Sequence, residues 1–328
     1  MFREGRVLVT GGAGFMGSDF LRYLLTETRF NGTVVNLDLL TYAANLENLK
    51  EIEKDPRYVF VKGDICDEKL IARLFSQYQF ELIVHFAAET HVDRSIDQPK
   101  TFIETNIIGT YTLLEFVRRH PKTRLHLIST DEVYGDLPEY GVFTEESNYA
   151  PSSPYAASKA AADHLAEAYA RTYELFVTIS HASNNYGPHQ HAEKLIPKII
   201  DACESGRDIT VYGSGKQVRD WLHVRDHSRA IFMILSYGKS GEVYNVGGAN
   251  ERTNLEVIHH IITQYAKITK KDSEVFRERI IHVADRPGHD FRYAMDITKM
   301  SREIGWEPEI EFDHGLQEAI LERIKKKL

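Results

Sequence analysis

The chain has 328 residues, of which 42% are hydrophobic and 27% are charged, and its formal net charge is −8 at pH 7. This length allows a large buried core that divides into two lobes, and the acidic balance argues against nucleic acid or an anionic membrane as the main partner. The two cysteines have no metal-ligand spacing, no signal peptide precedes the first strand-like segment and no apolar run could span a bilayer, so we expect a cytoplasmic protein without a metal site.

Short β-rich runs alternate with helical patterns in the first half of the chain. The expected strands are Arg6–Thr10, Val34–Asp38, Tyr58–Lys62, Leu82–Phe86 and Leu125–Thr130. The helical patterns between them lie near Gly14–Thr28, Glu68–Gln77 and Thr101–Arg119. Strands separated by helices of this length predict right-handed crossovers. The expected fold is therefore α/β, with a Rossmann-type doubly wound parallel sheet that collects its ligand at the carboxyl ends of the strands.

The amino-acid composition and the length of the expected elements change in the second half of the sequence. Helix Tyr155–Tyr173 leads into strand Phe176–Ser180, and the chain beyond is rich in Gly, Pro, His and Asn, with shorter elements. We predict a dinucleotide-binding domain over residues 1–182 and a smaller, mixed α/β substrate lobe over residues 183–328. Residues 221–250 are expected to pack back against the sheet.

A glycine-rich turn follows the first strand. Gly11, Gly14 and Gly17 stand at i, i+3 and i+6, between that strand and the first helical pattern. This spacing suits a tight turn and a backbone that approaches a pyrophosphate closely, beside a helix N-terminus whose N–H groups attract phosphate. Glycine also marks ordinary turns, but the position between a strand and a helix supports a dinucleotide site.

Asp38 ends the second strand, 21 residues after Gly17. A carboxylate there can accept hydrogen bonds from both hydroxyls of an adenosine ribose and would repel a 2′-phosphate, which favours NAD over NADP. The alternative is an ordinary strand-end aspartate. Asp64, after the third strand, is placed to meet the adenine, although aspartate is also common in loops.

Tyr155 and Lys159 are four residues apart on an expected helix and therefore share one face. An ammonium group near the phenol, together with a positively charged nicotinamide, would lower the pKa of the tyrosine. Tyr155 could then take the proton of a substrate hydroxyl while the same carbon gives up hydride. Tyrosine–lysine pairs of this spacing are common on exposed helices. The glycine-rich turn earlier in the sequence is what favours a catalytic role for Tyr155 and Lys159.

Asp131 and Glu132 follow the fifth strand, at the edge where such sheets react their substrates. Two neighbours cannot both point inward from a regular strand, so the backbone must turn here if both act. Adjacent carboxylates can serve as acid and base when their surroundings separate their pKa values. The alternative is a turn-capping aspartate beside a solvated glutamate.

With these residues in place, the chain resembles the extended short-chain dehydrogenase/reductase family, in its dTDP-glucose 4,6-dehydratase branch. The resemblance covers nearly the whole length and rests on the runs Thr10–Phe15, Ala87–Ser95, Thr130–Gly135, Ser183–Pro188, Val218–Leu222 and Asp285–Asp290. The run Thr130-Asp131-Glu132 is its specific part, because epimerases and decarboxylases of the family share the glycine turn and the Tyr–Lys pair.

The resemblance implies an NAD-dependent nucleotide-sugar 4,6-dehydratase, a hydro-lyase that acts on dTDP-glucose. Tyr155, helped by Thr130 and Lys159, would deprotonate the sugar 4-hydroxyl as hydride passes from C4 to NAD. Glu132 would remove the C5 proton while Asp131 protonates the departing C6 hydroxyl. Hydride would then return to C6 and a proton would reach C5. The product would be a 4-keto-6-deoxy sugar, with the cofactor bound throughout.

The resemblance also implies the residues of each site. Expected cofactor contacts are Gly11, Gly14, Phe15, Met16, Gly17, Asp38, Asp64, Ile65, Phe86, Ala87, Ala88, Thr90, Thr105, Tyr155, Lys159 and Asn185. Expected substrate contacts are Thr90, Thr130, Asn184, Lys194, Leu195, Thr210, Val211, Tyr212, Arg219, Asn254, Arg286 and His289. A homodimer is expected, with helices 101–119 and 155–173 at its seam.

Departures from the family pattern fall near the substrate. The family usually has Thr-Arg-Cys where this chain has Ser180-His181-Ala182, and His189 and His191 replace aromatic residues. These histidines are expected to hydrogen-bond as neutral groups in the substrate loop. The departures keep UDP-N-acetylglucosamine open as the substrate, with 4,6- or 5,6-dehydration. The sequence is also compatible with a sugar 4-epimerase or with a non-catalytic dinucleotide-binding protein.

Overall fold

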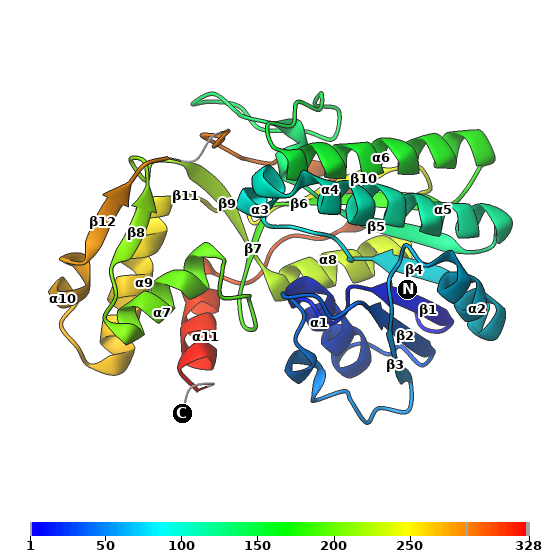
Figure 1. The fold of residues 1–328 in the computed structure, drawn as a ribbon, viewed down its shortest axis with the longest axis horizontal. Coiled ribbons are helices and arrows are strands. Elements are labelled where there is room, and N and C mark those ends of the chain that lie inside the picture. The colour runs from blue at the N-terminus through cyan, green and yellow to red at the C-terminus, as the bar shows by residue number, and fades with distance from the viewer. Residues whose placement is uncertain (1, 286–287, 326–328) are drawn as a thin grey trace.

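A seven-stranded parallel sheet dominates the computed structural model, which describes residues 2–285 and 288–325 (Figure 1). The strands are β1 (Arg6–Thr10), β2 (Thr33–Asp38), β3 (Tyr58–Lys62), β4 (Leu82–His85), β5 (Arg124–Thr130), β6 (Val177–Ala182) and β10 (Val243–Val246). Their order is β10-β6-β5-β4-β1-β2-β3, and every neighbouring pair is parallel. The chain runs outward from β1 through β2 to β3 and then crosses back to β4, on the other side of β1. A ligand crevice forms at such a reversal of strand order, where β1 and β4 end.

Helices cover both faces of this sheet (Figure 1). They are α1 (Phe15–Arg22), α2 (Glu68–Tyr78), α3 (Val92–Asp97), α4 (Pro99–Phe102), α5 (Thr110–Arg119), α6 (Pro154–Tyr173) and α8 (Val224–Tyr237). Alternate residues of β1 explain the two layers, since Leu8 joins the core under α2, α5 and α6, whereas Val7 and Val9 join the core under α1 and α8. The expected doubly wound fold is confirmed.

The smaller lobe carries a three-stranded sheet and a two-stranded parallel pair, at the left of Figure 1. Its strands are β7 (Asn184–Tyr186), β8 (Ile209–Tyr212), β9 (Val218–His223), β11 (Glu251–Thr253) and β12 (Ile280–Val283). Its helices are α7 (Leu195–Ser205), α9 (Asn254–Thr269), α10 (Glu274–Arg277) and α11 (Phe312–Lys325). They enclose a second core, in which Trp221 and Phe312 lie among isoleucines of α7 and α9.

Most expected elements lie within a residue or two of their predicted bounds. Helix α6 begins at Pro154 because the Ser153 side chain accepts the Ala156 N–H and caps the helix. Helix α8 packs against α1, and β10 extends the large sheet beside β6, so part of the second half joins the first. The domain boundary at residue 182 stays a prediction. No helix in the described ranges is long and apolar enough to cross a bilayer.

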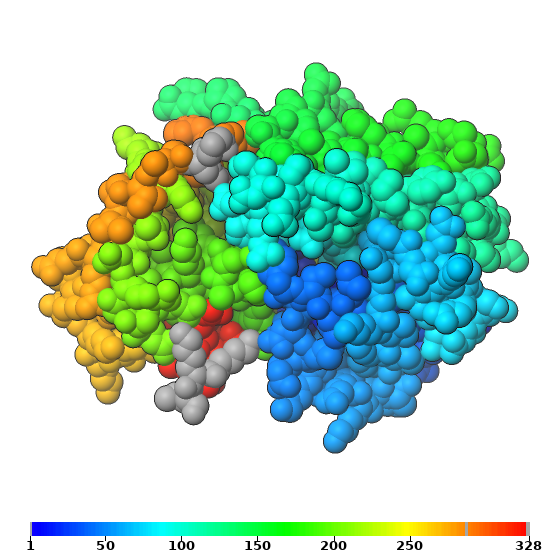
Figure 2. Space-filling model, in the orientation of Figure 1, coloured from blue at the N-terminus to red at the C-terminus, as the bar shows by residue number. Residues whose placement is uncertain are grey.

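Segments from distant parts of the sequence meet between the two lobes. On the face shown in Figure 2, the blue N-terminal segment adjoins the cyan segment after β4 and the green segment around α7. The carboxyl ends of β1, β2, β4 and β5 open toward this seam, which is where the candidate site lies.

Candidate active site

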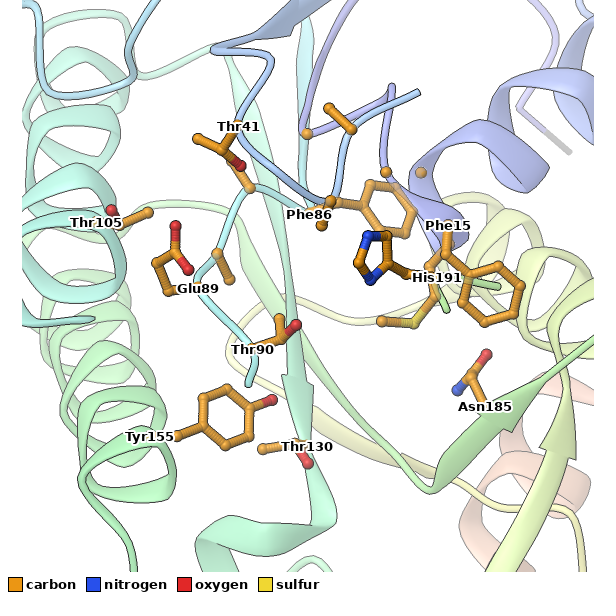
Figure 3. A pocket seen from close by; sticks show the side chains of 18 of the residues that line it. Phe15, Thr41, Phe86, Glu89, Thr90, Thr105, Thr130, Tyr155, Asn185 and His191 are labelled. Atoms are coloured by element: carbon orange, nitrogen blue, oxygen red, sulfur yellow. The ribbon is translucent and has the colours of Figure 1, made fainter. Parts of the chain in front are cut away.

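A cavity of about 670 Å³ lies at the carboxyl ends of the central strands and reaches the first residues of the smaller lobe (Figure 3). The predicted residues that line it are Gly11, Gly14, Phe15, Met16, Gly17, Asp38, Asp64, Ile65, Phe86, Ala87, Ala88, Thr90, Thr105, Thr130, Asp131, Glu132, Tyr155, Asn184, Asn185, Lys194 and Leu195. The fold thus brings the glycine turn, the acidic pair and the tyrosine to one cavity.

The glycine turn between β1 and α1 is shaped by close backbone packing. Gly11 has a φ of +71°, and a Cβ there would lie 2.6 Å from the backbone nitrogen of Ala87. A Cβ on Gly17 would lie 2.4 Å from the carbonyl oxygen of Gly11. Gly14 is different, because a Cβ there would meet only that oxygen, at 3.2 Å. Helix α1 starts without a side-chain cap, so its first N–H groups are left for a ligand in the cavity.

Asp38 is held at the end of β2 by two backbone hydrogen bonds. Its Oδ2 accepts the Ala13 N–H at 2.8 Å and its Oδ1 accepts the Leu40 N–H at 2.8 Å. Burial raises the pKa of this carboxyl group, and the two backbone donors oppose the shift. Each oxygen keeps a lone pair, so the group can still accept hydrogen bonds from a diol.

The segment after β4 forms one wall of the cavity, with Glu89 and Thr90 facing inward (Figure 3). Asn106 fixes it, because its amide accepts the Glu89 N–H at 2.8 Å and donates to the Glu89 carbonyl at 3.0 Å. The same amide donates to the Ser158 hydroxyl of α6 at 2.8 Å. Lys194 donates from Nζ to the Thr90 carbonyl at 3.1 Å and so ties the smaller lobe to this wall.

Tyr155 points its hydroxyl toward Thr130 at the end of β5 (Figure 3). Burial and the Glu132 carboxylate raise the pKa of Tyr155, whereas the neighbouring Thr130 hydroxyl lowers it. The lowered pKa that we predicted depends on the charge of a bound nicotinamide as well as on Lys159, so it stays a prediction.

Lys159 is not among the residues that line the cavity, and its predicted cofactor contact stays a prediction. It is 5% exposed, and its Nζ donates to the Ile128 carbonyl of β5 at 2.7 Å. Burial lowers the pKa of this ammonium group, whereas the charge of Asp163 raises it. Lys159 therefore lies buried one helical turn after Tyr155 on α6.

The backbone turns directly after β5, as the acidic pair requires. Thr130 ends the strand, and residues Asp131–Tyr134 form a 3₁₀ turn in which the Thr130 hydroxyl accepts the Glu132 N–H at 3.3 Å. The turn lets both residues line the cavity. Asp131 is only 2% exposed, whereas Glu132 is half-buried. One strand end therefore gives two neighbouring carboxylates different surroundings.

The pKa of Asp131 is raised well above its usual range, first by burial and then by the neighbouring Glu132. Its Oδ1 accepts from the Thr130 hydroxyl at 3.2 Å, and its Oδ2 has no hydrogen-bond partner within residues 2–285 and 288–325. A carboxyl group with this environment holds its proton at higher pH than an exposed aspartate and is suited to act as a general acid.

Several expected substrate contacts lie outside the cavity lining. They are Thr210, Val211, Tyr212, Arg219, Asn254 and His289. Arg286 falls outside the described residues. The six are grouped around β8, β9 and the start of α9 in the smaller lobe, and Val211 is buried in its core. Their roles stay predictions.

Among these six residues, Arg219 is close enough to the acidic pair for its charge to affect Asp131. Its guanidinium donates to the carbonyls of Val218 and Asp290, at 2.7 and 2.8 Å, and stacks on the Tyr293 ring at 4.2 Å. It is 5% exposed, and its charge lowers the pKa of Asp131. Near it, His289 Nδ1 lies 2.6 Å from an oxygen of Asp285.

Other cavity residues were not predicted. Thr41, Ala43 and Ala44 follow β2, and Gln190, His191 and Glu193 precede α7. The first group could have been found from its position after a strand that ends at the ligand edge. The Tyr42 hydroxyl donates to Glu193 at 3.3 Å and so joins these two segments.

The three histidines of interest occupy different surroundings. His181 lies in strand β6, fully buried, and not in a loop as we predicted. His189 and His191 each lie near a glutamate, with 3.4 Å from His189 Nδ1 to Glu322 and 3.7 Å from His191 Nδ1 to Glu193. Within the described part of the chain, no group of three His, Cys, Asp or Glu side chains could hold a metal ion.

Comparisons with known proteins agree with this geometry. The family model described as GDP-mannose 4,6 dehydratase matches residues 8–319. A dTDP-glucose 4,6-dehydratase of Salmonella typhimurium is 49% identical over 96% of this chain and 91% of its own length, and one of Neisseria gonorrhoeae is 50% identical over 98% and 96%. A crystal structure of dTDP-glucose 4,6-dehydratase from Streptomyces venezuelae, with NAD and dTDP bound, superposes with a TM-score of 0.92 at 44% identity and covers 98% of both chains.

Proposed function

The chain belongs to the GDP-mannose 4,6-dehydratase family, and we propose that it is an NAD-dependent dTDP-glucose 4,6-dehydratase. The product is dTDP-4-keto-6-deoxyglucose, formed by loss of water across C5 and C6. The observation that carries the proposal is the 3₁₀ turn after β5, which directs Asp131 and Glu132 into the cavity that Tyr155 lines. A 4-epimerase needs the tyrosine and the cofactor but has no use for this acidic pair.

The residues of the cavity fit NAD. The glycine turn leaves a surface without side chains at Gly14, and the uncapped start of α1 presents N–H groups to phosphate. Asp38 is fixed as an acceptor for ribose hydroxyls and would repel a 2′-phosphate. When bound, NAD accepts hydride from C4 of the sugar and later returns it to C6, while a proton returns to C5.

The first proton transfer falls to Tyr155. The 4-hydroxyl of the sugar gives its proton to the phenolic oxygen, and the neighbouring Thr130 hydroxyl favours the phenolate because it lowers the pKa of Tyr155. Because burial raises the pKa of Tyr155, the phenolate needs positive charge nearby, which Lys159 supplies from one turn further along α6. Such a proton transfer contributes about 10²–10⁴-fold to the rate.

The elimination then uses the two carboxylates. A carbonyl at C4 acidifies the C5 proton, which the half-buried Glu132 removes. The C6 oxygen leaves as water with the proton that Asp131 donates from its buried carboxyl group, whose raised pKa keeps that proton available. The assignment of acid and base follows from the difference in burial between the two neighbours.

Substrate binding is proposed to extend from the cavity into the smaller lobe. Lys194 and the start of α7 lie at the cavity edge and would meet the diphosphate, while Arg219, Asn254 and His289 lie beyond it, toward the nucleoside. The proposed division at residue 182 gives cofactor binding to the first part of the chain and nucleotide recognition mainly to the second.

We further propose a homodimer in the cytoplasm. Large apolar side chains are exposed along the continuous helical stretch from α4 to α5, with Ile103 at 50% and Tyr111 at 40%. Tyr173 at the end of α6 is 44% exposed and continues this surface. An apolar surface of this kind on paired helices is typical of a subunit interface.

Incubation of the purified protein with NAD and dTDP-glucose tests the function. A 4-keto-6-deoxy product absorbs in alkali and has the mass of the substrate minus water, whereas an epimer shows neither change. UDP-N-acetylglucosamine is offered in parallel. Conversion of that sugar alone, or of neither, would refute the proposed substrate.

A further inference from the structure

The side chain of Asn185 carries an amide group at the wall of the cavity (Figure 3). Successive side chains of a strand point to opposite faces, so within β7 Asn185 points away from Asn184 and Tyr186. Tyr186 belongs to the core of the smaller lobe. Asn185 therefore points to the other side, where helix α8 packs against β7.

Three hydrogen bonds hold Asn185 in place. Its Nδ2 donates to the Ser183 carbonyl at 3.0 Å, and its Oδ1 lies 3.0 Å from Nδ1 of His227 on α8. Gln190 donates from Nε2 to the backbone carbonyl of Asn185 at 2.8 Å. Ser183 and Gln190 line the cavity themselves, whereas His227 is not among the lining residues and is only 1% exposed. The proposed mechanism gives no part to His227.

These contacts decide which nitrogen of the His227 ring carries a proton. If the Asn185 amide were turned around, its oxygen would face the Ser183 carbonyl, and two acceptors would meet at 3.0 Å. Oδ1 of Asn185 therefore faces His227 and accepts from Nδ1–H. Nδ1 carries this proton whether the ring is neutral or charged.

The second ring nitrogen of His227 has no use for a proton. In the part of the chain that the structure describes, Nε2 has no hydrogen-bond partner, so a proton there would be a buried donor without an acceptor. Burial also lowers the pKa of the ring to about 4, although the charge of Asp19 opposes the shift. At neutral pH the ring therefore has a single proton, on Nδ1, and Asn185 accepts it.

From these contacts, and on the basis of the proposed function, we propose that His227 is a positioning residue for NAD binding. Its Nδ1–H holds Oδ1 of Asn185, and the Ser183 carbonyl holds one of the two Nδ2 protons, so the amide is fixed before a ligand enters. The second Nδ2–H is then available, in one orientation, to an acceptor on the cofactor. A group oriented in advance costs less ordering entropy on binding. No contact with NAD or substrate is assigned to His227.

A double-mutant cycle tests this relation through the Kd of NAD, measured by calorimetry. His227→Phe keeps a planar ring and removes the donor, so the Kd should rise about 3–10-fold, which corresponds to the loss of one hydrogen bond. Asn185→Ala removes the group that His227 positions. Adding His227→Phe to Asn185→Ala should then change the Kd by less than about twofold, because no amide is left to orient.

His227→Asn is the conservative variant, because its amide nitrogen comes close to the position of Nδ1 and can still donate. It should keep the Kd of NAD within about twofold of the wild-type value. His126→Phe is the matched control. His126 of β5 is also buried, at 0% exposure, but its ring nitrogens lie 2.9 and 3.2 Å from the Thr178 and Ser180 hydroxyls. This variant should lose thermal stability and leave the Kd of NAD unchanged.

The proton on Nδ1 can also be observed in wild-type protein without a ligand. In protein labelled with ¹⁵N at histidine, Nδ1 of His227 should have the chemical shift of a protonated nitrogen and Nε2 that of an unprotonated one. The His227 signals are assigned with His227→Asn. This measurement decides the hydrogen bond to Asn185 even where His227→Phe does not fold.

A proton on Nε2 in place of Nδ1 would overturn the proposal, and so would an unchanged Kd of NAD in folded His227→Phe. An effect of His227→Phe that persists in full beside Asn185→Ala would also overturn it, because His227 would then act without Asn185. If wild-type protein binds NAD but does not convert dTDP-glucose, the proposed function is wrong, while the cycle still decides the role of His227. Absence of NAD binding would overturn both.

Discussion

Asp131→Asn should disable the elimination and stabilise the protein in the same variant. Asp131 is 2% exposed, one of its oxygens accepts only from Thr130, and the other has no partner in the described ranges of the chain. An amide at this position cannot donate an acidic proton to the leaving oxygen. Loss of a general acid costs about 10²–10⁴-fold in kcat, or about 2.7–5.4 kcal/mol of transition-state stabilisation.

The gain in stability follows from the raised pKa of Asp131. A carboxyl group whose pKa is higher in the folded than in the unfolded state binds more protons when folded, so stability falls as pH rises from the unfolded value, about 3.9, toward the folded one. The neutral amide avoids this loss. At pH 8 the variant should be more stable by about 1–3 kcal/mol, the usual desolvation cost of an unsatisfied buried group, and the advantage should vanish near pH 4.

The assay combines kinetics and unfolding. Because Tyr155, Thr130 and Lys159 are unchanged in Asp131→Asn, oxidation at C4 should persist. Reduced cofactor should therefore accumulate on mixing with dTDP-glucose and be detected by its absorbance. Urea unfolding of wild type and variant at pH 4, 6 and 8 gives the stability difference directly. Wild-type turnover, or a stability difference that does not change with pH, would refute the assignment of Asp131 as the buried acid.

Three further predictions concern separate parts of the structure. Glu132→Gln should keep KM for dTDP-glucose within about threefold and lower kcat by about 10²–10⁴-fold in steady-state assays; full activity would exclude Glu132 as the C5 base. Gly17→Ala should destabilise the fold by about 1–3 kcal/mol through its 2.4 Å clash, whereas Gly14→Ala should weaken NAD binding in calorimetry and leave the melting temperature near wild type. Ile103→Lys should convert a dimer into monomers by light scattering, and a monomeric wild type would remove the proposed interface.

The sequence predicted the large sheet well because its signals are local. The strands β1 and β3 have the expected bounds, and the glycine turn stands between β1 and α1 as its spacing indicates. The turn at Asp131 was also predictable, since two adjacent inward carboxylates are incompatible with a regular strand. Each of these features depends on residues that are neighbours in the chain.

Long-range relations were harder to predict. Sequence spacing cannot show that Thr210 and Asn254 stand outside the cavity while His191 and Glu193 line it, because the packing of the two lobes decides this. The burial of Tyr155 depends on how α6 packs against its neighbours, which a helix pattern does not reveal. The prediction of a loop position for His181 was wrong for the same reason, because the residue belongs to a buried strand.

The acidic pair shows how a single strand end can supply both an acid and a base. A regular strand would send Asp131 and Glu132 to opposite faces of the sheet, and only one could meet the substrate. The 3₁₀ turn brings both to the cavity but leaves Asp131 deeper than Glu132. Since depth raises the pKa of a carboxyl group, the same backbone feature that joins the two residues also separates their roles. An epimerase with this turn would carry a buried, destabilising carboxyl group without a use for it, which is why the geometry favours dehydration.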